Sequence, residues 1–109
     1  MSLKSNIIKN RKQFKFVISE STRSFIDSLV DYYISEAGSY RQMAKSYSEE
    51  VGDIPSAAFG IILGSIYSAF IQSYTNQQQK PSLEDIQEFT QLVKKRAAQI
   101  KRSVLDAKV

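Results

Sequence analysis

The chain has no cysteine, no histidine and no tryptophan among its 109 residues. Without cysteine it can form no disulfide, no thiolate metal site and no thiol nucleophile. Without histidine it also lacks the commonest general base and the commonest metal ligand. No glycine-rich phosphate loop and no Glu-x-x-His metal pattern occurs in the sequence. We therefore expect a non-enzymatic protein with no catalytic residues, no metal site and no cofactor.

Proline and glycine are scarce, with two and four residues respectively. Because both residue types interrupt regular secondary structure, their scarcity favours long helices. A chain of 109 residues suits a single domain whose core needs neither metals nor disulfides, so one domain is expected over residues 1–109. The amino-terminal residues lack the long apolar core of a secretory signal, and we therefore expect a cytoplasmic protein.

Charge is missing from one long stretch, residues 54–79. Asp53 and Pro55 are typical of a helix start, and the apolar part of the stretch predicts a helix over about 55–75. Small residues occur at every fourth position of that helix, in one row: Ser56, Gly60, Gly64 and Ser68. Such a row forms a shallow groove in which another backbone can come close.

An uncharged helix is buried either in protein or in lipid. This one reaches the lower length limit of a membrane span, and Gly60-x-x-x-Gly64 matches a close-approach motif of membrane helices. The flanking segments, however, predict amphipathic helices whose apolar faces need a cover. We expect the helix to be covered by protein, at the centre of the domain, with membrane insertion as the less favoured alternative.

The preceding segment has the most regular apolar pattern. Apolar residues are spaced alternately by four and three positions from Ile26 to Val51, which predicts a helix over about 22–51. Gly38 lies inside this helix and marks a position where it could bend or break.

Large and small side chains alternate along the same helix, with Tyr33, Tyr40 and Tyr47 separated by alanines. We expect these rings to pack between helices, against Gly60 and Gly64. A ligand pocket lined by the tyrosines is the less favoured alternative.

The two ends of the chain complete the expected fold. Ser82 and Asp85 have the spacing of a capping box and precede an apolar stripe, which predicts a helix over about 83–106. Residues 1–19 form a basic segment, either a short helix, partly disordered at its start, or a strand over 14–18. The expected architecture is all-α: an up-and-down bundle of three to four helices around the uncharged helix. Because so few helices leave apolar surface uncovered, we expect a homo-oligomer, most simply a twofold dimer.

Four helices running up and down would place both chain ends together and gather basic residues at one pole. The candidate polyanion-binding residues are Lys9, Arg11, Lys12, Lys15, Lys94, Lys95, Arg96, Lys101 and Arg102. Phosphate contact is one explanation of this cluster, and the preference of cations for helix ends is the other. The favoured function is a self-associating protein-interaction module. The alternatives are a nucleic-acid-binding accessory protein and a membrane-associated regulator.

Overall fold

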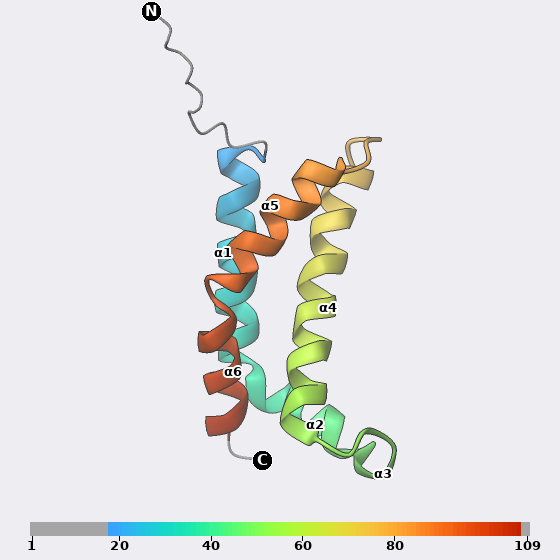
Figure 1. Cartoon of the computed structure of the whole chain (residues 1–109), viewed down its shortest axis with the longest axis vertical. Helices are drawn as coiled ribbons and strands as arrows, with labels where there is room; N and C mark the ends of the chain where they lie inside the picture. The colour runs from blue at the N-terminus through green and yellow to red at the C-terminus, as the bar shows by residue number, and fades with distance from the viewer. Residues whose placement is uncertain (1–17, 108–109) are drawn as a thin grey trace, which may run out of the picture.

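The computed structural model describes residues 18–107, whose regular elements are all α-helices, so the expected all-α helical bundle is confirmed. The helices pack as three rods, which run down, up and down in the view of Figure 1. The first rod is α1 with α2, which turns from the lower end of α1 towards α4; the second is α4, and the third is α5 with α6. Their bounds are α1 Glu20–Ser35, α2 Ala37–Lys45, α3 Ser48–Val51, α4 Ile54–Thr75, α5 Leu83–Lys94 and α6 Ala97–Asp106.

Short-range signals set the helix starts. The Oγ of Ser19 accepts a hydrogen bond from the backbone N–H of Thr22 at the start of α1. Asp53 caps α4, with Pro55 in the first turn. Ser82 and Asp85 make both bonds of the expected capping box at α5. Each bond satisfies a backbone N–H that has no partner within the helix.

The two long predicted helices are both divided. The segment 22–51 breaks at Glu36 and again at Ser46 and Tyr47, whereas Gly38 lies inside α2. The break at Glu36 lets α2 turn towards α4, where its buried Ala37 and Ala44 permit close packing (Figure 1). The segment 83–106 similarly divides at Lys95 and Arg96.

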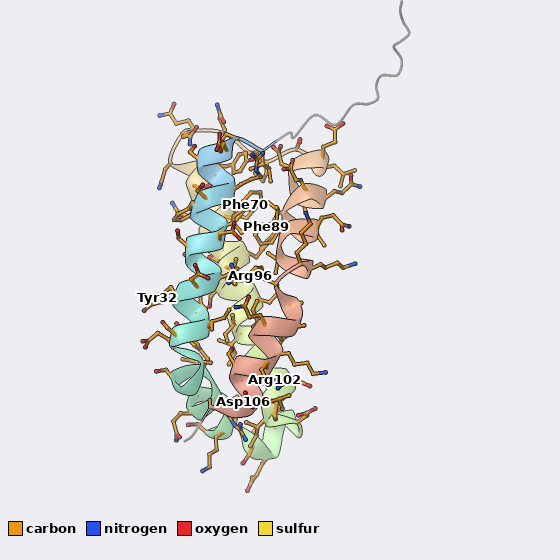
Figure 2. All side chains as sticks on the ribbon, turned by 90° about the vertical axis from the view of Figure 1, so that its left-hand side faces the viewer. Tyr32, Phe70, Phe89, Arg96, Arg102 and Asp106 are labelled. Carbon is orange, nitrogen blue, oxygen red and sulfur yellow. The ribbon has the colours of Figure 1, made fainter. Side chains whose placement is uncertain are left out.

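The core lies between the three rods. From α4 it takes Ala58, Ile62, Ile66 and Phe70, which follow one another at four-residue intervals and are all buried. The ring of Phe70 stacks on that of Phe89 from α5, with 4.5 Å between the ring centroids (Figure 2). The other buried apolar residues of the cluster are Ile18, Ile26, Val30, Ala37, Ala44, Val93, Ile100 and Val104.

The expectation that α4 is covered by protein on all sides is wrong. Only 22% of the residues in its most apolar stretch are buried. The row of small residues lies two positions from the buried row, which is about 200° around a helix with 3.6 residues per turn. Ser56, Gly60, Gly64 and Ser68 are therefore exposed. Two other rods cover one side of α4 and leave the opposite side open.

The expected meeting of the two chain ends lies outside the described residues 18–107 and stays a prediction. Because the described rods number three, Ile18 and Ala107 lie at opposite ends of the bundle (Figure 1). Four of the candidate basic residues, Lys9, Arg11, Lys12 and Lys15, fall outside the described residues.

Candidate interaction face on helix α4

The exposed row of small residues borders open space at the surface of the molecule. A Cβ atom built on Gly60 or Gly64 would meet no heavy atom within 4 Å outside its own helix. The predicted stacking of tyrosine rings on these glycines is therefore wrong for the single chain. Of the three tyrosines, Tyr33 comes nearest, since it lines a shallow hollow of about 570 Å³ together with both glycines. The glycine row is therefore accessible to the backbone of another molecule.

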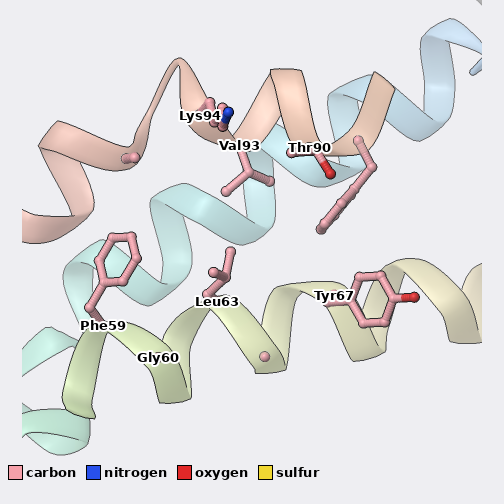
Figure 3. A pocket seen from close by; sticks show the side chains of 10 residues that line it. Phe59, Gly60, Leu63, Tyr67, Thr90, Val93 and Lys94 are labelled. Atoms are coloured by element: carbon pink, nitrogen blue, oxygen red, sulfur yellow. The ribbon is translucent and has the colours of Figure 1, made fainter. Parts of the chain in front are cut away.

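A second and more apolar hollow borders the same row on its other side. We call it the α4–α5 groove: it has a volume of about 660 Å³ and lies between α4 and α5 (Figure 3). Leu63 on α4 and Val93 on α5 point towards each other across it (Figure 3). Leu63 and Tyr67 are 36% and 40% exposed, so the rim of this hollow is itself apolar surface in contact with water. Together with the glycine row, these residues form a continuous uncharged face.

Two of the three predicted tyrosines, Tyr33 and Tyr40, contact each other and pack against the core. The rings of Tyr33 and Tyr40 have centroids 5.3 Å apart, and both residues are half-buried. Burial, followed by the neighbouring Tyr33, raises the pKa of Tyr40 above its ordinary value. Tyr47 is 58% exposed and lies outside the core, between α2 and α3. The predicted tyrosine line thus divides into a packed upper pair and a ring exposed to solvent.

Four of the predicted basic residues, Lys94, Lys95, Lys101 and Arg102, are exposed on α5, its end and α6. Arg96 differs from them because it forms ion pairs with Asp27, at 3.3 Å, and with Asp31. The hydrogen bond to Asp31 is the main cause that raises the pKa of Arg96, and partial burial opposes it. Arg96 lies midway along the bundle and ties the α5–α6 junction to α1 (Figure 2). It is a structural cation, less available to an external polyanion than its neighbours.

Arg41 was not singled out by sequence reasoning, yet it holds the end of the last helix. Its Nη1 donates to the carbonyl oxygens of Val104, Leu105 and Ala107, at 2.9, 3.0 and 3.3 Å. These carbonyls end α6, where the helix dipole is negative and intrahelical donors run out. No local pattern could reveal this role, since the partners lie more than 60 positions further along the chain.

Within residues 18–107, no group of three or more acidic side chains lies close enough to hold a metal ion. One helix in the same range, α4, is long and apolar enough by length and composition to cross a membrane, which is weak evidence because soluble core helices pass the same test. The chain matches no protein-family model, no curated protein and no solved structure. The functional argument therefore depends on the surface of the molecule itself.

Proposed function

We propose that this protein is a non-enzymatic interaction module that self-associates through the uncharged face of α4. One observation carries the proposal: a 22-residue helix without a charged side chain is open to solvent along a row of small residues. The exposed side of a surface helix normally carries charged or strongly polar residues. The absence of such residues is typical of a surface that another protein covers.

The side chains on this face favour a protein cover over a lipid one. Burial in lipid gains free energy in proportion to apolar area, and glycine and serine contribute little of it. Small residues instead favour a second helix, because two backbones can approach closely over them. A second copy also adds no charge to the face, since α4 itself has none. A twofold pair of α4 helices is the simplest assembly with these properties.

The test replaces both glycines of the exposed row with leucine. Because a Cβ at either position meets nothing within 4 Å in the single chain, Gly60→Leu/Gly64→Leu should fold normally and lose self-association. Light scattering at micromolar concentration should give twice the chain mass of 12.4 kDa for the natural sequence and 12.4 kDa for the variant. Ala98→Leu, which adds leucine to an exposed position of α6, is the matched control and should remain dimeric. A monomeric natural chain at these concentrations would refute the proposal.

A second candidate function is weakly sequence-specific binding of nucleic acid by α5 and α6. The observation that favours it is the exposure of Lys94, Lys95, Lys101 and Arg102 along one rod. Such binding should weaken steeply with salt, because each phosphate contact releases counterions. Retention on RNA at moderate salt, lost when Lys94 and Lys95 are reversed to glutamate, would support it. Elution of the protein from RNA at low salt would refute this second candidate function.

A further inference from the structure

The α4–α5 groove results from the way α5 is held. At the upper end the ring of Phe89 lies between the helices, 4.5 Å from Phe70 and 5.6 Å from Tyr67 between centroids. At the lower end the ion pairs of Arg96 hold the end of α5 against α1 rather than α4. The two helices therefore stay apart below Phe89, and the space between them is not filled by side chains of the described residues. A volume of about 660 Å³ lies within the usual range of small-molecule sites.

The lining of the groove has a simple chemistry. Its walls are carbon surfaces of α4 and α5, extended by Ala97 at the start of α6 (Figure 3). Of the residues that line it, Lys94 is the only charged one. Thr90 adds a hydroxyl whose hydrogen is donated to the carbonyl of Ile86 at 2.9 Å, so its oxygen remains an acceptor at the rim. A second cation, Lys101, borders a smaller hollow that shares Phe59 with the groove.

We infer that the α4–α5 groove binds a single-chain amphiphile with an anionic head, such as a long-chain carboxylate. The apolar chain lies between Leu63 and Val93, and the head pairs with Lys94 at the rim. Charge complementarity decides between occupants. Residues 1–17 carry five basic residues and no acid, so they would bring like charge to Lys94. The α4 helix of a second copy has no acid to offer either.

The proposed ligand site adjoins the self-association face and overlaps it in part, since both include Gly60 and Gly64. The two can be measured independently, since one is read from ligand binding and the other from molecular mass. A chain that binds the carboxylate and remains monomeric would refute self-association alone. A dimer that binds no carboxylate would refute the ligand site alone.

The test is calorimetric titration of the full chain with decanoate and dodecanoate below their micelle concentrations. We expect one site per chain and an affinity that rises about fourfold for each added methylene while the groove fills. Thr90→Leu fills the groove from the side of α5 and should weaken dodecanoate binding at least tenfold. Its matched control, Gln91→Leu, places leucine on an exposed neighbouring position that does not line the groove, and should change nothing.

The role of the head group is tested with a second pair of variants. Lys94→Gln should weaken dodecanoate binding about two- to fivefold, the size expected for an exposed ion pair, and leave dodecanol binding unchanged. Lys95→Gln, an exposed neighbour outside the groove, should leave both unchanged. Absence of dodecanoate binding would overturn the proposal, as would full binding by Thr90→Leu. Binding to phosphatidylglycerol vesicles without binding of monomeric dodecanoate would also overturn it and identify a membrane surface instead.

Discussion

Replacement of Gly60 and Gly64 by alanine should stabilise the single chain. Each new Cβ enters open space on a helix, with no heavy atom within 4 Å, so no packing is lost. Alanine is favoured over glycine by about 0.8–1.0 kcal/mol at such a position, which makes the double variant more stable by about 1.6–2.0 kcal/mol. At roughly 4–8 °C per kcal/mol for a domain near this size, the melting temperature should rise by about 6–16 °C.

The measurement is thermal unfolding by circular dichroism over a dilution series. At the lowest concentration we expect both chains to be monomeric, and the double alanine variant should then melt at the higher temperature. At high concentration the proposed association should stabilise the natural chain, and it should stabilise the variant less because the variant's backbones are kept further apart. Ala98→Gly, at an exposed position of α6, is the matched control and should lower stability by about 1 kcal/mol.

One result would refute this reasoning. If the double alanine variant melts at a lower temperature even at the greatest dilution, the glycines must touch another part of the same chain. The uncharged helix would then be covered on both sides, and the exposed face of α4 would not exist in solution.

Four further predictions test the core, two structural arginines and a half-buried tyrosine. Ile66→Ala should lower the free energy of unfolding by about 2–5 kcal/mol in urea titrations, since Ile66 is fully buried; a loss below about 1 kcal/mol would contradict its place in the core. Arg41→Met should cost about 1–3 kcal/mol and speed amide exchange in α6, whereas unchanged exchange there would contradict its capping role. Arg96→Met should cost about 1 kcal/mol at low salt and less in high salt, because its acidic partners are exposed; a salt-independent loss would point to packing instead. Burial, followed by the charge of Asp85, raises the pKa of Tyr74 above 10.0. The stability that Tyr74 contributes is therefore present below pH 10.0 and is lost as the pH rises through the folded-state pKa. Tyr74→Phe should reduce this alkaline loss, measured as the denaturant midpoint against pH, and an identical loss would exclude Tyr74 as its source.

Much of the fold can be predicted because helix boundaries are local. Asp53, Ser82 and Asp85 act within three residues of the backbone groups that they satisfy, so their spacing in the sequence is sufficient to identify them. The uncharged helix is equally evident from composition. The break at Glu36 is less evident from the sequence, because its position depends on where α2 packs against α4.

The candidate face could be predicted only in part. The sequence identified the row of small residues on α4, and its spacing alone places these residues on one side of a helix. It could not say which side faces the core, because a helix without charged residues has no polar side to mark the solvent. That choice was decided by the packing of α4 against α2 and α6. The partners of Arg41 and Arg96 were likewise decided by tertiary contacts, which span more than 60 positions of the chain. Local chemistry therefore determined which helices form and where they begin, and only tertiary contacts decided which of their faces remain open.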